Sequence, residues 1–434
     1  MRFRPRRGRI DGPSNDPLGG RREELRRPDQ RGFPVNEHAS QNASQNASQN
    51  ASQRHLPTRL RAGRRGLAAA VTTMVAAAVV AGVLAPGTAS AAPRPDSVQQ
   101  SLDALVKEDK VPAALATVKG RDGRVRTYTA GIGNAATKAK VPMDGQVRIG
   151  SNTKAFTAVV VLQLVAEGKI GLDANVDTYL PGLVRGEGID GRNITVRQLL
   201  QHTSGLPEYV DRDAVLNAPK RYYEPRELLD AALAQKAHFA PGTQWEYNNT
   251  GFLLAGMIIQ KVTGRPLGEE ITKRVIDRIG LRHTYFPAPG DMTIHEAHPK
   301  GYQRAENGSL RDYTELDPSW GWAAGAIVST NTDVTRFYGA LLGGRLLPAA
   351  QLAQMRTTVP AEAIGAGAGY GLGLVSRPLS CGGVAWGHGG TIPGYETAGG
   401  TTDDGRAVNF TVTTIPDADT AKRVDKAVDE ALCR

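Results

Sequence analysis

Apolar positions along the chain change their spacing from segment to segment, and this spacing predicts the elements. Residues 97–107 carry apolar side chains at the period of one helix face. Two strand-like runs follow, residues 111–118 and 124–130, on either side of the turn Asp122-Gly123. This part of the chain therefore predicts an amphipathic helix that packs on a sheet.

The middle of the chain has mostly helical spacing. Residues 151–165 are apolar on most faces and are closed by Gly168, a residue type expected just past a helix end, so they predict a buried helix. Loops rich in Gly and Pro separate further helical stretches, which are predicted at residues 225–235, 250–262 and 333–342.

Strand composition returns near the end of the chain, at residues 384–388, 395–399 and 407–413. The last two runs flank Asp403-Asp404-Gly405, which is a hairpin signal, and a final helix is predicted at residues 420–433. Because strands lie at both ends and helices between them, the sequence predicts an α+β fold. One antiparallel sheet is built from both chain ends and faced by helices, and a mostly helical subdomain is added to it.

The first 91 residues differ in composition from the rest. Residues 1–58 are rich in Arg, Gly, Pro, Asn and Gln, which predicts a disordered, low-complexity extension. Residues 59–91 run from a basic cluster through an uncharged apolar stretch to Ala89-Ser90-Ala91, the order of a signal peptide cleaved after Ala91. The 19 uncharged residues could nearly span a bilayer of roughly 30 Å, so an uncleaved anchor is the alternative. We expect a secreted bacterial protein, membrane-anchored if the leader is kept, with one folded domain at residues 92–434.

The charge balance excludes one class of partner. The formal net charge is +10, but residues 1–91 hold 15 basic and 6 acidic side chains, so residues 92–434 carry 38 against 37. The folded domain therefore lacks the basic surplus typical of nucleic-acid binding. The eight His show no ligand spacing and the two Cys cannot form a four-thiolate site, so no metal or other cofactor is expected.

Ser151 and Lys154 begin the predicted buried helix and lie three residues apart, on the same helix face. The helix start supplies amide groups and a partial positive charge that favour a developing anion. A lysine in an apolar site loses its proton more easily, because desolvation disfavours the ammonium, and can then accept the serine proton. The pair is a candidate nucleophile and base, although a capping serine beside a surface lysine has the same pattern.

Two further short patterns extend this interpretation. Tyr247-Asn248-Asn249 lies in a turn before the helix from residue 250, and His388-Gly389-Gly390-Thr391 lies on a late strand. Each pattern alone fits a packing tyrosine or a glycine turn. In the order Ser-x-x-Lys, Tyr-x-Asn and His-x-Gly, the three together resemble the signature of penicillin-recognising serine hydrolases. These are the class C β-lactamases, the secreted DD-carboxypeptidases and related esterases.

The resemblance covers essentially all of residues 92–434 and implies a β-lactamase/transpeptidase-like fold. Further matching stretches are residues 199–206, Trp320 ahead of 323–326, and 369–374. Typical class C β-lactamases have Lys at the position of His388, so this residue is similar to the carboxypeptidase and esterase branches. The sequence looks closest to the extracellular D-alanyl-D-alanine carboxypeptidase/transpeptidase type.

That type also has a cysteine seven residues before this histidine and another near the mature C-terminus. The resemblance therefore implies a disulfide between Cys381 and Cys433. Such a bridge would close a loop of about 50 residues and add on the order of 3–4 kcal/mol of stability in the chain-entropy treatment. Two separate buried thiols are the alternative.

The resemblance also implies a mechanism. Ser151 attacks the carbonyl of the penultimate D-Ala and forms an acyl-enzyme, which is then hydrolysed or transferred to an amine. Lys154 and Tyr247 form the base system, in which either the neutral amine or a phenolate takes the serine proton. Asn249 orients the substrate amide and Lys154, while His388 forms the far wall and is expected to hydrogen-bond Tyr247.

Substrate binding is implied at Thr391, Gly389, Gly390, Trp320 and Arg377. The backbone amide of Thr391 is expected to form the oxyanion hole with that of the serine, and the two glycines let the strand edge approach a peptide closely. The carboxypeptidase type usually has a hydroxyl residue at the position of Gly389 and, at Val375, an arginine that holds the terminal carboxylate. Arg377, two residues on and on the same strand face, either takes over that role or is a solvated surface charge.

Three functions stay open. The first is an exported, monomeric serine DD-carboxypeptidase that removes the terminal D-Ala from peptidoglycan-type peptides and is inhibited by penicillins. The second is a β-lactamase-like esterase or a β-lactamase, and the third is a weakly active penicillin-binding protein. The expected partners are D-Ala-D-Ala-ending peptides or related acyl substrates, with β-lactams as inhibitors and no nucleic acid.

Overall fold

The computed structural model describes residues 96–305 and 307–434. The predicted extension at residues 1–58 and the predicted leader at residues 59–91 lie outside the described residues. Among the described residues, no helix combines the length and the apolarity needed to cross a bilayer.

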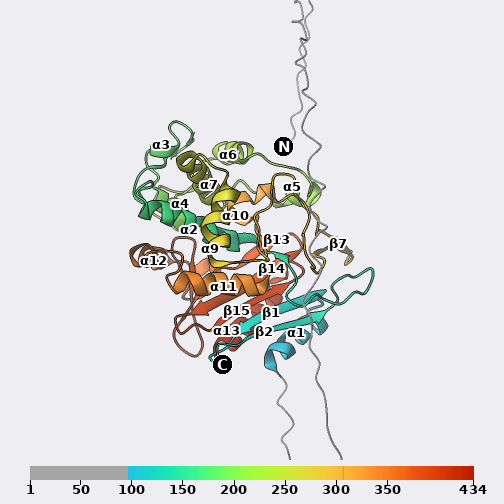
Figure 1. Cartoon of the computed structure of the whole chain (residues 1–434). Coiled ribbons are helices and arrows are strands. Elements are labelled where there is room, and N and C mark those ends of the chain that lie inside the picture. The colour runs from blue at the N-terminus through green and yellow to red at the C-terminus, as the bar shows by residue number, and fades with distance from the viewer. Residues whose placement is uncertain (1–95, 306) are drawn as a thin grey trace, which may run out of the picture. The chain divides into compact units, whose positions relative to one another are not determined.

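Helices and strands occur in separate runs along the described chain (Figure 1). The helices, with 3₁₀ and π segments written η, are α1 Ser97–Lys107, η1 Gly150–Asn152, α2 Thr153–Ala166, α3 Val176–Tyr179, α4 Val196–Gln201, α5 Arg212–Asn217, α6 Pro225–Leu233, α7 Thr250–Thr263, α8 Leu267–Ile271, η2 Thr272–Ile276, α9 Asp277–Ile279, η3 Pro318–Trp320, α10 Trp322–Gly325, α11 Asn331–Leu342, α12 Ala349–Arg356, η4 Glu362–Ile364 and α13 Ala418–Leu432. The strands are β1 Ala113–Lys119, β2 Val125–Gly131, β3 Val147–Arg148, β4 Arg185–Gly186, β5 Ile189–Asp190, β6 Tyr302–Arg304, β7 Leu310–Asp312, β8 Val328–Ser329, β9 Val359–Pro360, β10 Gly369–Tyr370, β11 Val375–Pro378, β12 Val384–Gly387, β13 Gly390–Ile392, β14 Tyr395–Thr402 and β15 Ala407–Val412.

The main sheet joins the two ends of the described chain. Its strands follow the order β2-β1-β15-β14-β12-β11-β10-β9, and β13 pairs with β14 beside this path. All of these pairings are antiparallel, and β1 meets β15 in a register that places Ala114 opposite Val412. The predicted antiparallel sheet from both chain ends is therefore confirmed.

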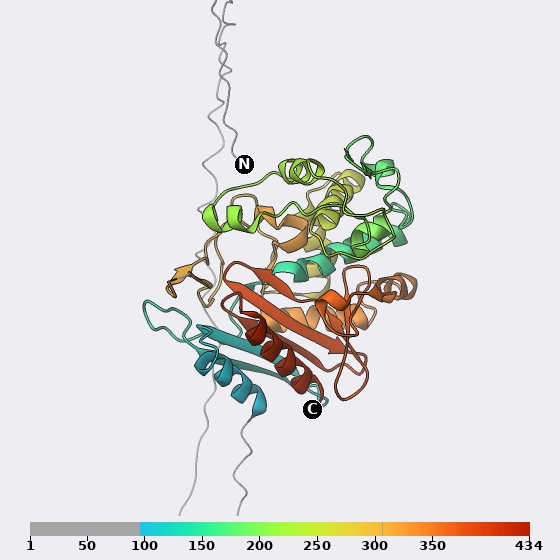
Figure 2. The same ribbon diagram turned by 180° about the vertical axis from the view of Figure 1, so that it is seen from behind.

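Helices cover both faces of this sheet. α1 and α13 pack on one face, and α11 packs on the other against β1, β14 and β15 (Figures 1 and 2). Because the central strands are covered on both faces, every residue of β15 is buried, whereas the edge strand β2 has one buried residue. α13 packs on the sheet with one side only. Its buried stripe is formed by Val424, Ala427, Ala431 and Leu432, and its other face is charged.

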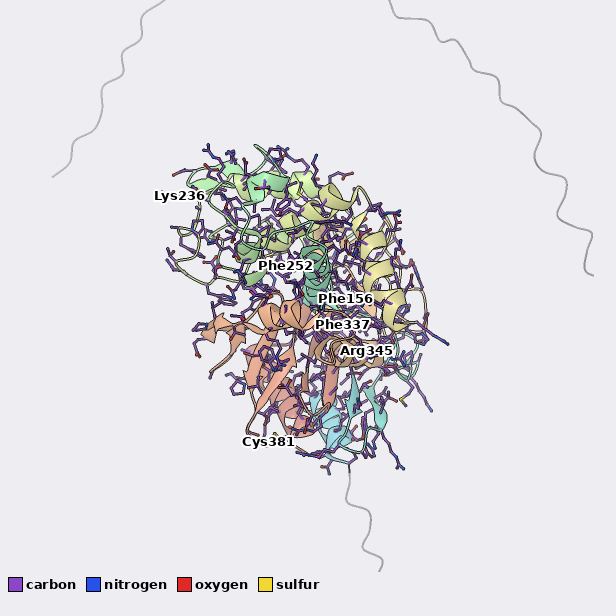
Figure 3. All side chains as sticks on the ribbon, turned by 60° about the vertical axis from the view of Figure 1, so that its left-hand side comes forward. Phe156, Lys236, Phe252, Phe337, Arg345 and Cys381 are labelled. Carbon is purple, nitrogen blue, oxygen red and sulfur yellow. A yellow bond between two sulfur atoms is a disulfide. The ribbon has the colours of Figure 1, made fainter. Side chains whose placement is uncertain are left out.

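The predicted helical subdomain surrounds α2, which is buried along almost its whole length. α2 packs against α7 and α10. Phe156 of α2 stacks on Phe337 of α11 with ring centroids 3.8 Å apart, and Phe252 of α7 belongs to the same core (Figure 3). This central helix links the subdomain to the sheet, so residues at its start lie between the two parts.

Two local boundaries differ from the prediction, and both affect candidate residues. Ser151 lies in the 3₁₀ turn η1, because Gly150 before it has a φ of +48° and the α-helix begins only at Thr153. β12 ends at Gly387, so His388 lies in the link to β13 and not on a strand. Each residue thus sits on a sharp backbone turn between two regular elements.

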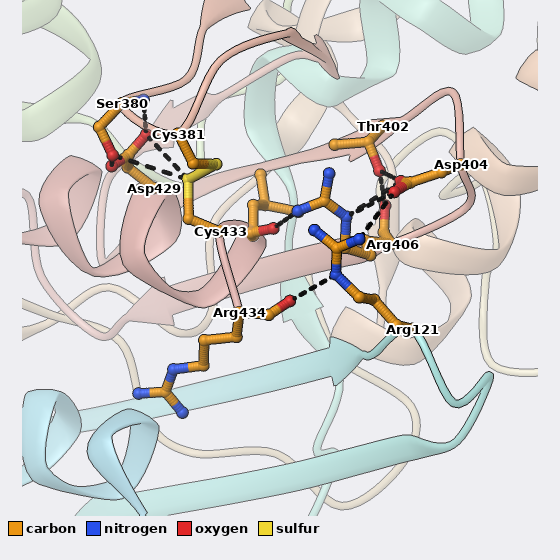
Figure 4. Close-up of a disulfide and its surroundings, with 10 residues drawn as sticks. Arg121, Ser380, Cys381, Thr402, Asp404, Arg406, Asp429, Cys433 and Arg434 are labelled. Carbon is orange, nitrogen blue, oxygen red and sulfur yellow. Dashed lines mark hydrogen bonds and ion pairs between the residues drawn. A yellow bond between two sulfur atoms is a disulfide. The ribbon is translucent and has the colours of Figure 1, made fainter.

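The disulfide between Cys381 and Cys433 is confirmed. Cys381 lies in the turn between β11 and β12, and Cys433 directly follows α13 (Figure 4). Asp429 of α13 accepts a hydrogen bond from the main-chain N–H of Ser380 at 2.9 Å. The bridge therefore ties the last helix to the sheet face on which it packs.

Candidate active site

Residues from distant segments line one cleft of about 680 Å³ between the sheet and the helical subdomain. The cleft includes most of the residues that the sequence singled out, namely Ser151, Tyr247, Asn249, Trp320, Arg377, His388, Gly389, Gly390 and Thr391. Lys154 lies directly beneath them in α2 and is fully buried. The structure thus brings together every predicted catalytic and substrate-binding residue.

The amine of Lys154 has three polar neighbours. Nζ lies 3.0 Å from Ser151 Oγ, 2.6 Å from Asn249 Oδ1 and 3.1 Å from the main-chain oxygen of Ala324. A neutral amine has two N–H groups and one lone pair, and the two carbonyl oxygens can only accept. If they take the two hydrogens, the lone pair points at the serine hydroxyl.

The electrostatic surroundings favour this neutral form. Burial lowers the pKa of Lys154 to about 7, while the carboxylate of Glu208 acts in the opposite direction. A large fraction of the amine is therefore uncharged at neutral pH, and a group whose pKa lies near the working pH is well suited to general base catalysis. The alternative of a surface lysine is therefore wrong, because Lys154 is fully buried.

Tyr247 is the second candidate for proton transfer. Its ring centroid lies 4.8 Å from Lys154 Nζ. Burial and the carboxylates Glu208 and Glu396 raise the pKa of Tyr247, and its hydrogen bond with Ser151 only partly offsets this. The side chain is therefore a neutral phenol at neutral pH, able to donate a proton but poorly suited to abstract one.

Asn249 is held by a carboxylate that sequence reasoning missed. Its backbone N–H and its Nδ2 donate to Glu208 Oε2 at 2.8 and 3.0 Å, and Glu208 Oε1 accepts from the N–H of Val210 at 3.0 Å. This network fixes the side-chain oxygen of Asn249 toward Lys154. One Nδ2 hydrogen is left for the substrate amide, as the resemblance implied.

His388 has a different hydrogen-bond partner from the expected Tyr247. Its Nδ1 lies 2.6 Å from the main-chain oxygen of Gly389, which can only accept, so Nδ1 carries the hydrogen. Nε2 then accepts from the hydroxyl of Tyr370 at 3.0 Å. Burial lowers the pKa of His388 to about 3, so the ring is neutral and forms part of the wall without a charge.

Two glycines, Gly390 of β13 and Gly150 of η1, let β13 pack closely on the turn that carries Ser151. A Cβ on Gly390 would lie 2.0 Å from the main-chain oxygen of Ile149, and one on Gly150 would lie 2.9 Å from the nitrogen of Thr391. Side chains at either position would therefore push β13 away from the turn that carries Ser151. This close contact brings the amides of Ser151 and Thr391 together, as an oxyanion hole requires.

Two predicted substrate-binding residues form the outer walls. Trp320 ends η3, and its main-chain oxygen accepts a hydrogen bond from the Tyr209 hydroxyl at 2.8 Å. Arg377 of β11 lines the cleft, but its Nη1 donates to Asp425 Oδ1 of α13 at 2.8 Å. Exposed ion pairs of this kind contribute little stability, so the guanidinium can change partner at small cost.

Sequence reasoning missed several residues of the site. Glu208 lies two residues after the matched stretch 199–206, and Tyr370 lies inside the matched stretch 369–374. The motifs therefore pointed to these segments but gave neither residue a role. Buried His202 packs behind the candidate tyrosine with ring centroids 4.3 Å apart. Glu396 also lines the cleft, and nothing in the sequence marks it, because it lies in an ordinary strand.

A buried amine directed at a serine hydroxyl, beside a phenol and an oxyanion-type backbone pocket, defines a serine hydrolase that works through an acyl-enzyme. Comparison with known proteins agrees with this class. The chain belongs to the Beta-lactamase family, which it matches over residues 98–432.

Three relatives place the chain within this family. Protein flp of Staphylococcus aureus (strain N315) is 30% identical over 207 residues, which are 46% of this chain and 40% of that protein, so the match spans less than half of its length. Penicillin-binding protein 4 of Amycolatopsis lactamdurans is 29% identical over 275 residues, 60% of this chain and 69% of that protein. The crystal structure of a D-stereospecific amidohydrolase from Streptomyces sp. is 40% identical with a TM-score of 0.70, covering 77% of this chain and 98% of that one.

Proposed function

We propose that the protein is a serine amidohydrolase that cleaves the amide bond following a D-amino acid residue. The observation that carries this proposal is the Lys154 amine, buried and 3.0 Å from Ser151 Oγ. The D-configuration is supported by the similarity to the D-stereospecific amidohydrolase from Streptomyces sp.. The resemblance to enzymes that act on D-Ala-D-Ala points to the same configuration of the acyl residue.

The site geometry supports the following sequence of steps. Ser151 Oγ attacks the substrate carbonyl as its proton passes to Lys154 Nζ, and the amides of Ser151 and Thr391 hold the oxyanion. Tyr247 donates its proton to the leaving nitrogen, and Lys154 returns a proton to the phenol. Water then attacks the acyl-enzyme, with the amine again as base, and the D-residue leaves as its carboxylate.

The stereochemical part of the proposal is tested with the D- and L-alanine p-nitroanilides. An L-residue whose amino group and side chain keep the positions of the D-residue has its carbonyl where the D-residue has its α-hydrogen. The scissile carbonyl is then displaced from the oxyanion pocket, and small misplacements cost on the order of 100-fold in rate. We therefore expect kcat/KM for the D-compound to exceed that for the L-compound by about that factor. Release of p-nitroaniline is the measurement, and equal turnover or L-preference would contradict the proposal.

A second candidate is the exported DD-carboxypeptidase expected from the sequence, which would release terminal D-Ala from N-acylated peptides. The position of Arg377 favours it, because this guanidinium lines the cleft and is held only by an exposed ion pair with Asp425. The similarity to a penicillin-binding protein also supports it. Export and a monomeric state remain part of this proposal.

Arg377→Ala tests the second candidate. We expect KM for a D-Ala-D-Ala peptide to rise about tenfold with kcat little changed, because a charge-assisted hydrogen bond to the terminal carboxylate is lost. An N-acyl-D-alanyl ester, which has no such carboxylate, is the control substrate and should be unaffected. An unchanged KM for the peptide would remove Arg377 from the site.

A further inference from the structure

We infer that one end of the cleft, formed by Glu396 of β14 and Gln303 of β6, binds a positively charged amino group of the substrate. The inference rests on the proposed amidohydrolase function and names the substrate class more closely. The group bound there is the α-amino group of an unblocked D-aminoacyl residue. Both side chains line the same cleft as Ser151.

The position of Glu396 follows from strand register. Glu396 is the pairing partner of Thr391 across β13 and β14, so the two side chains lie on the same face of the sheet, toward the cleft. The amide of Thr391 is the expected oxyanion donor. The carboxylate is therefore one strand spacing, about 5 Å, from the strand that holds the substrate carbonyl.

Gln303 reaches the same end of the cleft from a neighbouring segment. The backbone of Gly301 packs against Gly394, since a Cβ on Gly301 would lie 2.8 Å from the main-chain oxygen of Gly394. One residue on, the N–H of Tyr302 donates to the main-chain oxygen of Thr413 at 3.0 Å. The start of β6 thus lies beside the start of β14 and the end of β15, and Gln303 and Glu396 line the same cleft.

Both side chains present acceptors without a donor. Among the described residues, Glu396 Oε2 and Gln303 Oε1 are buried and have no hydrogen-bond partner. Burying an unpaired acceptor, and above all a carboxylate oxygen, costs free energy that a bound donor recovers. An ammonium group has three N–H donors and a positive charge, so one such group offers enough donors for both acceptors.

The charged residues around Glu396 do not supply that donor. A hydrogen bond with the Thr391 side chain and the charges of Arg212 from α5 and Arg377 from β11 lower the pKa of Glu396, whereas Asp425 from α13 raises it. Burial outweighs these effects and raises the pKa to about 7. Arg377 is itself paired with Asp425. Binding of a cation therefore favours the ionised carboxylate and balances its charge, at a carboxyl group whose Oε2 has no hydrogen-bond partner among the described residues.

The distance between β13 and Glu396 identifies which amino group of the substrate fits. An α-amino nitrogen lies about 2.5 Å from its own carbonyl carbon, and a charge-assisted hydrogen bond adds about 2.8 Å. Together these lengths span one strand spacing between the oxyanion strand and Glu396. An N-acylated residue has no charge there and only one N–H, so the site favours D-aminoacyl amides with a free amino group.

The test compares D-alanine p-nitroanilide with its N-acetyl form in wild type and in Glu396→Gln. The substitution keeps the shape and removes the charge. We expect kcat/KM for the unblocked substrate to fall about 10- to 100-fold, as for loss of a charge-assisted hydrogen bond. The loss for the acetylated substrate should be at least tenfold smaller. Gln303→Glu, which adds a second carboxylate, should increase the preference for the unblocked substrate.

The matched control is Glu315→Gln, which makes the same change at an exposed carboxylate that pairs with Lys220, and it should leave both rates unchanged. Thermal unfolding of each variant verifies that it is folded. Equal losses for the two substrates, or no loss for either, would overturn the inference. Wild-type enzyme that cleaves only the acetylated compound would also overturn it while the proposed function stands. Turnover of neither compound would contradict both the inference and the proposed amidohydrolase function.

Discussion

Ser151→Ala should lose acylation completely. Wild-type protein treated with a penicillin is expected to gain the mass of one β-lactam, and the variant to gain none, because the attacking oxygen is gone and Lys154 has no proton to accept. Amide hydrolysis should fall at least about a thousandfold, since removal of a nucleophile leaves only binding and the oxyanion pocket. Intact-mass spectrometry and p-nitroaniline release are the two measurements.

The control for this variant is Ser309→Ala. Ser309 lies in the exposed turn between β6 and β7, where its hydroxyl bonds the side chain of Asn307. Its replacement should leave labelling and turnover at the wild-type level. A Ser151→Ala protein that still becomes covalently labelled would move the nucleophile to another residue and end the proposed mechanism.

The sheet and the long helices could be predicted because each element is long enough to show a repeating spacing of apolar residues. α1 was predicted with its observed bounds, and β14 and β15 were found from two apolar runs around the Asp403-Asp404-Gly405 turn. Segments such as α9 and β10 contain only two or three residues, too few to show a period. The geometry of β10, for example, is set by its pairing with β9 and β11, which local sequence does not encode.

The residues of the site could likewise be predicted only in part. The serine, the lysine and the tyrosine were found because their motifs have fixed local spacing, and the structure brings them together in one cleft. Their supporting partners were not found, since each depends on tertiary placement. The histidine ring is held by Tyr370 from a two-residue strand, and Asn249 by Glu208 from a loop 41 residues earlier.

Burial of Lys154 is the physical feature on which the proposed catalysis depends most. An amine with an ordinary pKa is charged at neutral pH and cannot take the serine proton. With its pKa lowered to about 7, the free enzyme should gain activity as this amine loses its proton. We therefore expect kcat/KM to rise with pH between about 6 and 8, with an apparent pKa near 7.

Two substitutions separate Lys154 from other titrating groups. Lys154→Arg keeps a charge that cannot be removed at these pH values, so activity should fall at least about a thousandfold with no rising limb near pH 7. Glu208→Gln removes the negative charge that raises the lysine pKa, so its rising limb should shift to lower pH. Lys236→Arg, at an exposed lysine (Figure 3), should leave the profile unchanged. A wild-type profile that is flat from pH 6 to 8, or a Glu208→Gln limb shifted to higher pH, would remove the neutral amine from the role of base.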